Sequence, residues 1–367
     1  MSYIGIFVED NDTEAGFAEQ MSTKGKLQIK HERPQPVSKH SKAIFSANPD
    51  LLVLDFRLDL DLGDMDASEA YKGSAMAQQI RDQAINDPRH DFPIVLVSSE
   101  EKIRDQFEPD RTSHDLFDKV YAKEEVNSNR DKVRREVISL CKGYKVLRSK
   151  VGAFNLLDLA GLSSEQDYVL DYQELQLSLS RAVAPHLISA TFLNLLIGRT
   201  GLLLDINEAC ARLGVSSSEG NNIAAILDEH GLKYKGIFSD GWSRFWAHSL
   251  DEFAYDIFKS RATGIPADDR ATELSKYCGK KLQPALSPWT GKTDELIAFS
   301  CACCSNGTEM RHSVGVFEMG LPSFAVRRRI CWRCIHEDRY LDTQPPFMID
   351  DSDKSLVEEI KKREVPE

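Results

Sequence analysis

The stretch from Pro49 to Asp55 has apolar residues at its centre and ends in a single carboxylate, and it constrains the fold of the chain's first third. A continuous apolar run of this length, with polar residues on either side, is typical of a strand covered on both faces. Such strands belong to parallel sheets with helices packed on each side. In open sheets of this kind ligands bind beyond the carboxyl ends of the strands, so Asp55 is predicted to lie at a functional site.

Further strand and helix patterns alternate along the first 125 residues. The alternation predicts an α/β domain with a doubly wound parallel sheet. The other strands are expected at Tyr3–Val8, Leu27–Lys30, Phe92–Val97 and Val120–Ala122, with helices at Thr13–Met21 and Lys72–Ala84.

Polar residues follow the ends of these strands. Glu9 and Asp10 follow the first, Ser98 follows the fourth and Lys123 follows the fifth. Carboxylates suit Mg²⁺, a hydroxyl can donate to a phosphoryl oxygen, and an ammonium group supplies compact positive charge. A carboxylate accepts a phosphoryl group when that group is held in line with its charge neutralised. The pattern therefore predicts Mg²⁺-dependent phosphoryl transfer to Asp55.

In this order the motifs resemble those of a response-regulator receiver domain. The motifs are Glu9-Asp10, Asp55, Pro93-Ile-Val-Leu-Val-Ser98-Ser99, Lys123, and Gly73 before an amphipathic helix. The resemblance implies a flavodoxin-like, five-stranded sheet of order 2-1-3-4-5 and a histidine kinase as phosphodonor. It also implies that Asp55 is the phosphoacceptor, that Ser98 and Lys123 are catalytic, and that Mg²⁺ is bound by Glu9, Asp10 and Asp55.

The sequence departs from the family pattern at three places. Glu124 follows the lysine where a proline is usual, and the switch aromatic, Tyr121, lies one position nearer the lysine than usual. The stretch Arg57 to Tyr71 is an acid-rich insertion containing Asp59, Asp61, Asp64 and Asp66. We expect the insertion to be a solvated loop rather than a second metal site. The alternative for the whole domain is a receiver fold that no longer accepts phosphate.

Apolar residues at steps of four and three from Val133 to Val151 predict a connecting helix. Either its first half packs on the receiver fold and its second half enters the next domain, or the helix is continuous and carries a signal or builds a homodimer. The expected division is a receiver domain over 1–126, a connecting helix over 127–152, a mainly helical output domain over 153–290, a zinc-ribbon-like module over 291–345 and a charged C-terminal tail over 346–367.

Within the helical region, Asp205 is expected to cap a helix that ends before Gly214, and Leu232 to Phe238 is expected to form a strand. The segment from Glu208 to His230 has the order helix, glycine turn, helix, which fits a DNA-reading motif or an ordinary helical pair. The second of these helices contains no lysine or arginine to meet phosphates. We identify no catalytic constellation in this region and expect no enzyme activity beyond phosphoryl acceptance.

Two Cys-x-x-Cys turns, with 26 residues between them, predict a structural Zn²⁺ site. The expected ligands are Cys301, Cys304, Cys331 and Cys334, with Cys303 as a bystander and His312 or His336 as substitutes. Four thiolates leave no open coordination position, which favours a structural ion. Arg327-Arg328-Arg329 and Arg333 form a basic patch, which can contact nucleic-acid phosphates, an acidic protein face or solvent.

The formal net charge of -12 argues against non-specific nucleic-acid or anionic-membrane binding by the whole chain. The longest apolar run, Leu187 to Gly198, is too short to span a bilayer, and no basic segment followed by an apolar one begins the sequence. We therefore expect a cytoplasmic two-component response regulator with no membrane partner, whose output region acts through a downstream protein. The alternatives are a DNA-binding transcriptional response regulator and, third, a receiver-regulated enzyme.

Overall fold

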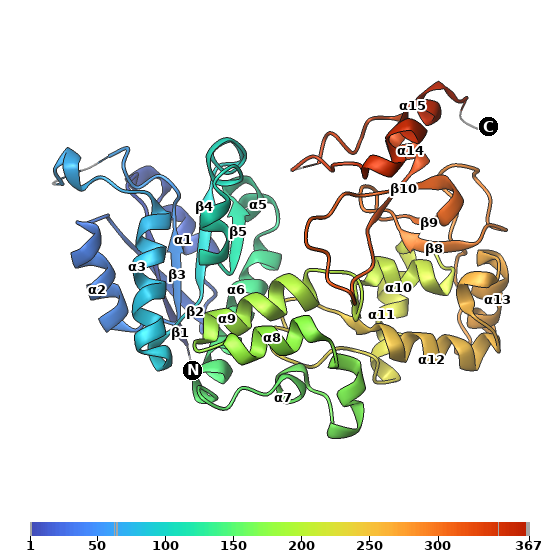
Figure 1. Ribbon diagram of the computed structural model, residues 1–367, viewed down its shortest axis with the longest axis horizontal. Coiled ribbons are helices and arrows are strands. Elements are labelled where there is room, and N and C mark those ends of the chain that lie inside the picture. Colours follow the sequence, from blue (N-terminus) through green and yellow to red (C-terminus); the bar gives the residue numbers. More distant parts are fainter. Residues whose placement is uncertain (1, 62, 64, 344, 365–367) are drawn as a thin grey trace. The chain divides into compact units, whose positions relative to one another are not determined.

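The computed structural model describes residues 2–61, 63, 65–343 and 345–364 (Figure 1). The chain divides into two compact units. Unit 1 comprises residues 1–194 and 236–242, and unit 2 comprises residues 195–235 and 243–367. The first unit therefore extends well beyond the predicted sheet, and the cysteine cluster belongs to the second.

Unit 1 contains a five-stranded sheet of order β2-β1-β3-β4-β5, in which every neighbouring pair is parallel. Parallel neighbours need crossover connections, and this order is that of the flavodoxin-like doubly wound fold. The predicted fold and strand order are confirmed. The strands are β1 (Tyr3–Val8), β2 (Leu27–Glu32), β3 (Leu51–Leu54), β4 (Ile94–Ser98) and β5 (Lys119–Ala122).

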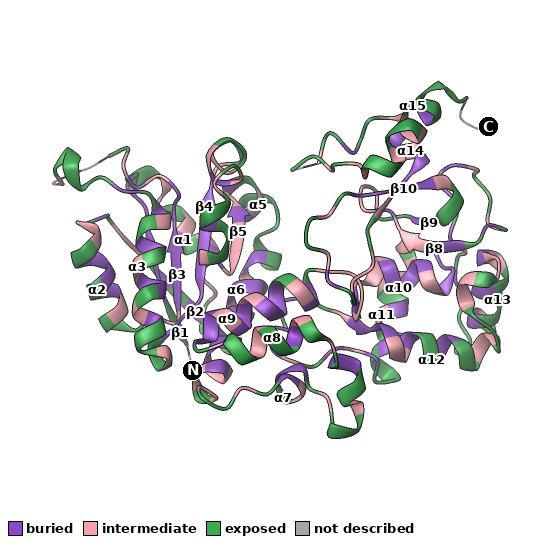
Figure 2. Ribbon diagram, in the orientation of Figure 1, coloured by how far each residue is buried: buried purple, intermediate pink, exposed green. Residues whose placement is uncertain are grey.

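Helices cover both faces of this sheet (Figure 1). On one face α1 (Gly16–Met21), α5 (Lys123–Ser128) and α6 (Arg130–Ser149) pack against one another. On the other face α2 (Val37–Ala47) packs against α3 (Gly73–Asn86). Alternate side chains of a strand point to opposite faces, and here both sets are apolar, so the central strands are buried throughout (Figure 2).

The connecting helix is α6, and it belongs to unit 1 along its whole length. Its apolar stripe is completely buried, so this face is a packing face of the unit and not an exposed dimer seam. Tyr144 in the stripe also donates a hydrogen bond of 2.6 Å to Asp118, directly before β5. The buried stripe consists of Val133, Val137, Leu140, Tyr144 and Leu147.

Three short helices follow α6 in the same unit: α7 (Leu156–Ala160), α8 (Gln173–Arg181) and α9 (Pro185–Ala190). Proline at the first position of α9 suits a helix start, because that N–H has no intrahelical partner. Ser189 of α9 donates to Asp118 at 2.5 Å, so α9 is fixed to the sheet domain by a polar contact.

The part of unit 2 that precedes residue 291 is mainly helical, as expected for residues 153–290, with α10 (Ile206–Leu213), α11 (Gly220–Glu229), α12 (Ala247–Phe258) and α13 (Ala267–Cys278) around one core. Asp205 caps α10 by accepting the Glu208 N–H at 2.8 Å, and Gly214 ends it with φ of 74°. Both predicted ends of this helix are confirmed.

The predicted strand from Leu232 to Phe238 is wrong. Within this segment only Lys233 forms a bridge, to Phe245, and a turn follows in which Phe238 has φ of 66°. A left-handed residue ends an extended segment, so the apolar side chains that suggested a strand are buried by a turn instead. The observed strand is β7 (Phe245–Trp246), which pairs antiparallel with β6 (Leu203–Leu204).

The segment predicted as a zinc-ribbon-like module, residues 291–345, is called the cysteine module below. It contains two small antiparallel sheets. One pairs β8 (Ile297–Ser300) with β9 (Gly307–Glu309), and the other pairs β10 (Ser313–Gly315) with β11 (Arg329–Cys331). The second Cys-x-x-Cys turn continues into α14 (Trp332–His336). The charged tail forms α15 (Lys354–Lys362), which buries Ile360 in the core of the module. Among the helices of the described residues, none combines the length and apolar character needed to cross a membrane.

Candidate functional site

Strand register brings the predicted receiver residues to one edge of the sheet. Val8 pairs with Leu54, Leu54 pairs with Leu96, and Ser98 pairs with Ala122. The residues that end or follow these strands therefore meet at the carboxyl edge, where ligands bind in this fold. All five predicted residues are buried there: Glu9, Asp10, Asp55, Ser98 and Lys123.

Asp55 is contacted on both of its carboxylate oxygens. Ser98 Oγ donates to Oδ1 at 2.9 Å, and Lys123 Nζ lies 3.3 Å from the same oxygen. The backbone N–H of Arg57 donates to Oδ2 at 2.8 Å, and Lys102 Nζ lies 3.6 Å from it. A hydroxyl, an amide and two ammonium groups around one carboxylate form an environment that can stabilise added negative charge.

Two buried acids of the site, Glu9 and Asp55, have raised pKa values. Burial and, after it, the nearby Asp55 carboxylate raise the pKa of Glu9 to about 7, against the opposing effect of Lys123. Burial also raises the pKa of Asp55. Two buried carboxylates with raised pKa values suit a divalent cation, which can replace the protons and neutralise both charges.

The side chain of Asp10 accepts hydrogen bonds from the backbone of the acid-rich insertion. Its Oδ2 accepts the backbone N–H groups of Leu60 at 2.8 Å and Asp61 at 2.9 Å. Arg33 connects the same two segments, because it donates to the Asp10 carbonyl at 2.8 Å and pairs with Asp61 at 2.6 Å. The described residues of the insertion are mostly exposed, as expected for a solvated loop, and two of its backbone amides also tie it to the acid pair. Asp64 of the insertion lies outside the described residues.

Gly73, at the start of α3, is required by a close backbone approach. A Cβ at this position would lie 2.2 Å from the carbonyl oxygen of Asp55, and the Gly73 N–H donates to Phe56 O at 2.9 Å. Only glycine lets α3 begin this near the strand end that holds Asp55.

Sequence reasoning missed two residues that contact the site. Glu14 pairs with Lys123 Nζ, which also lies 2.8 Å from Glu9 Oε2. Lys102 lies in the short helix α4 (Glu100–Lys102), which Ser99 begins by accepting the Lys102 N–H at 3.4 Å. The signal for Lys102 was its place in the turn directly after Ser98, which points it back toward the strand ends.

Tyr121 is the aromatic residue that lies one position nearer the lysine than the switch aromatic of receiver domains, and its side chain is buried. Its hydroxyl donates to Glu136 Oε2 of α6 at 2.7 Å, and both side chains are buried. Burial, then the Glu136 carboxylate, raises the pKa of Tyr121. In this structure the aromatic residue of β5 therefore links the sheet to α6.

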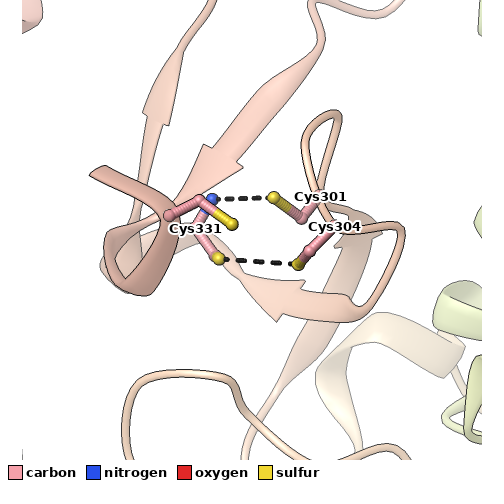
Figure 3. Close-up of side chains that lie close together, drawn as sticks. Cys301, Cys304 and Cys331 are labelled. Atoms are coloured by element: carbon pink, nitrogen blue, oxygen red, sulfur yellow. Dashed lines mark hydrogen bonds between the residues drawn. The ribbon is translucent and has the colours of Figure 1, made fainter. Parts of the chain in front are cut away.

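The cysteine cluster lies in unit 2, and its thiols point toward one another (Figure 3). The Sγ atoms of Cys304 and Cys331 are 3.9 Å apart. A tetrahedral Zn²⁺ with Zn–S bonds of about 2.3 Å places its sulfur ligands about 3.8 Å apart, so the spacing fits zinc. The Cys331 N–H donates to Cys301 Sγ at 3.2 Å, a contact that stabilises a thiolate. The compatible group is Cys301, Cys304, Cys331 and Cys334.

The other candidate ligands are not members of this group of four. Cys303 is outside the group of four. His336 contacts the carbonyl oxygen of Arg363 at 3.2 Å through Nε2, and His312 contacts Glu309 through Nδ1.

Comparisons with solved structures match the N-terminal part of the chain. The signal receiver domain of NarL from Mycobacterium tuberculosis is 16% identical, with 39% of this chain and 98% of that chain covered and a TM-score of 0.28. The chemotaxis response regulator CheY4 of Vibrio cholerae is 12% identical, with 36% and 99% covered and a TM-score of 0.26. NtrX from Brucella abortus is 16% identical, with 46% and 33% covered and a TM-score of 0.29.

The N-terminal third is similar in structure to response-regulator receiver domains. No family model matches the sequence, and the comparison with curated proteins found no match. The flavodoxin-like fold of the receiver-like part rests on the observed strand order and pairing.

Proposed function

We propose that the protein is a two-component response regulator in which Asp55 accepts a phosphoryl group from a histidine kinase. The observation that carries the proposal is the arrangement around Asp55, whose Oδ1 is met by Ser98 and Lys123 while Glu9 and Asp10 are buried beside it. Hydroxyl, ammonium and paired acids at one sheet edge are the groups that phosphoryl transfer to a carboxylate needs.

In the proposed reaction an Asp55 oxygen forms a bond to phosphorus while the phosphorus–nitrogen bond of a phosphohistidine breaks. The leaving imidazole takes the bonding electron pair and is protonated by solvent. A Mg²⁺ bound by Glu9, Asp10 and Asp55 would supply charge neutralisation. Ser98 donates to one phosphoryl oxygen and Lys123 contacts another.

Phosphorylation would change the partners of Lys123. In the unphosphorylated structure this ammonium group is paired with Glu9 and Glu14. New phosphoryl oxygens on Asp55 would compete for it and for the Ser98 hydroxyl, and would bias the loops that carry them. We propose that the change passes to an output region with a structural Zn²⁺ in its Cys₄ cluster, and that this region acts through protein contacts.

The test is intact-mass measurement of the full chain after incubation with a small acyl phosphate and Mg²⁺. Wild type should gain one phosphoryl group, which Asp55→Ala should not. Asp59→Ala is the matched control, because Asp59 lies in the adjacent insertion and pairs with Arg57 rather than contacting Asp55. An equal gain in mass for wild type and Asp55→Ala on incubation with the acyl phosphate would refute the proposal.

A second candidate function for the output region is nucleic-acid binding, and one cavity of unit 2 favours it. The cavity has a volume of about 210 Å³ and borders Cys301. Its wall gathers guanidinium groups, which suit phosphates. The arginines are Arg199, Arg244, Arg327, Arg328 and Arg329.

The helix pair expected as an alternative DNA reader is less suited to phosphates. The residues of α10 are mostly buried, and α11 exposes Asp228 and Glu229. DNA retention that weakens with salt and is lost in Arg327→Ala/Arg328→Ala would support the arginine cavity as the site. Absence of binding at low salt would exclude this second function.

A further inference from the structure

A second cluster of metal-ligand side chains lies in unit 2, apart from the four cysteines. It contains Glu295, Glu309 and His312, whose ligand atoms all lie within 4.8 Å of one another. The residue Glu309 is 2% exposed and Glu295 is 6% exposed. Two carboxylates this deeply buried need strong polar partners, because an isolated buried charge is unfavourable.

Hydroxyl groups orient both carboxylates. Ser287 Oγ donates to Glu309 Oε1 at 2.9 Å, and Thr290 Oγ1 donates to Glu295 Oε1 at 3.1 Å. His312 Nδ1 also contacts Glu309 Oε1. The other oxygen, Glu309 Oε2, is buried and has no hydrogen-bond partner. This leaves a fixed carboxylate with one oxygen held and one unsatisfied, as is usual for a metal ligand with its supporting hydrogen bond.

We propose that Glu295, Glu309 and His312 bind a first-row divalent cation such as Zn²⁺. Two carboxylate oxygens and an imidazole nitrogen form a mixed O/N set suited to such ions. The cation would satisfy Glu309 Oε2 and neutralise both acids. Arg311 pairs with Glu295 in the described structure, and its side chain is 66% exposed, so it can move into solvent when the cation binds.

Three protein ligands leave coordination positions open, in contrast to the closed cysteine cluster. Glu295 and Glu309 border a cavity of about 550 Å³, which is also lined by Arg261, Asp294 and Met310. The cavity provides an entry path for the ion and room for its water ligands.

The experiment measures zinc per chain in the full-length protein after loading with Zn²⁺ and dialysis against excess Mg²⁺, which keeps the receiver acids occupied. Wild type should retain about two zinc ions, one in each cluster. Glu309→Gln should lose one ion and keep the other, whereas Cys304→Ser should lose both, because Glu309 and His312 lie in the module that the Cys₄ ion holds together. His336→Ala is the matched control and should retain both, because His336 contacts Arg363 rather than this cluster.

One zinc ion in wild type, unchanged in Glu309→Gln, would overturn the proposal. If circular dichroism shows that Glu309→Gln does not fold, Ser287→Ala and Thr290→Val provide the second measurement. Each should weaken the affinity of the second ion by about 10-fold to 100-fold in a chelator competition, and unchanged affinity in both would also overturn it. These readouts are independent of phosphate on Asp55.

Discussion

His186 donates two hydrogen bonds to one oxygen of Asp91, from its backbone N–H at 2.7 Å and from Nδ1 at 2.9 Å. Asp91 lies before β4, and its other oxygen pairs with Arg81 of α3 at 2.9 Å. All three residues are buried. This contact joins α9, which is far along the chain, to the amino-terminal edge of the sheet.

Asp91→Asn should destabilise the protein by about 3 to 5 kcal/mol, because it leaves the buried Arg81 without one of its anionic partners. His186→Ala keeps the backbone hydrogen bond and should cost about 1 kcal/mol. Urea unfolding followed by circular dichroism measures both. His90→Ala removes an exposed ion pair with Asp87 and should change stability by less than about 0.5 kcal/mol. If Asp91→Asn lowered stability by as little as the His90→Ala control does, the result would contradict the buried ion pair between Asp91 and Arg81.

Gly73→Ala should destabilise the fold by several kcal/mol, because its Cβ would overlap the Asp55 carbonyl oxygen unless the backbone moved. The same variant should lose phosphoryl acceptance, since the movement displaces the strand end that holds Asp55. Thermal unfolding and intact-mass measurement test the two effects. In the control, Gly16→Ala, the new Cβ meets no atom within 4 Å, so stability should be unchanged or slightly higher.

Metal-free protein should lose stability as the pH rises from about 4.5 to about 7. In this window folded Glu9, with its pKa raised from 4.5 to about 7, binds more protons than the unfolded chain does. Glu9→Gln should reduce this pH dependence to the part that Asp55 contributes and be more stable than wild type above pH 7. Urea unfolding across this range, without metal, measures the effect, and parallel curves for the two proteins would contradict it.

Added Mg²⁺ should restore the stability that the metal-free protein loses as the pH rises, because the cation takes the place of the Glu9 proton. Its apparent affinity should therefore rise with pH up to about 7, by at most tenfold per pH unit for this one proton. Titration of Mg²⁺ against intrinsic fluorescence at several pH values measures this slope. Glu14→Gln is the control, because Glu14 pairs with Lys123 without being an expected Mg²⁺ ligand, and it should retain the slope.

Removal of zinc from the Cys₄ cluster should unfold the cysteine module, because the metal holds two separate turns together. Strong chelators or Cys304→Ser should lower the unfolding temperature of unit 2 in calorimetry and leave the transition of unit 1 nearly unchanged. Cys303→Ser should behave as wild type, because Cys303 is outside the group of four. Loss of zinc from Cys303→Ser would show that the ligand set is different.

The sequence determined the elements whose signals are local. The apolar run ending in Asp55, the acids after β1 and the alternation of strand and helix predicted the sheet and the residues at its carboxyl edge, and the resemblance to receiver domains implied the strand order. The spacing of the two Cys-x-x-Cys turns predicted the group of four thiols. Side-chain period and fixed spacing over a few residues carry this information.

Only the tertiary structure decided the contacts between segments that share no pattern. Examples are the Leu60 amide on Asp10, the ring of His186 on Asp91, and the convergence of Glu295 with His312. The turn at Phe238 belongs with them, because a left-handed backbone there overrode an apolar run that looked like a strand. In each case the outcome depends on which distant backbone or side-chain group satisfies a buried polar atom, and no periodicity in the chain records that choice.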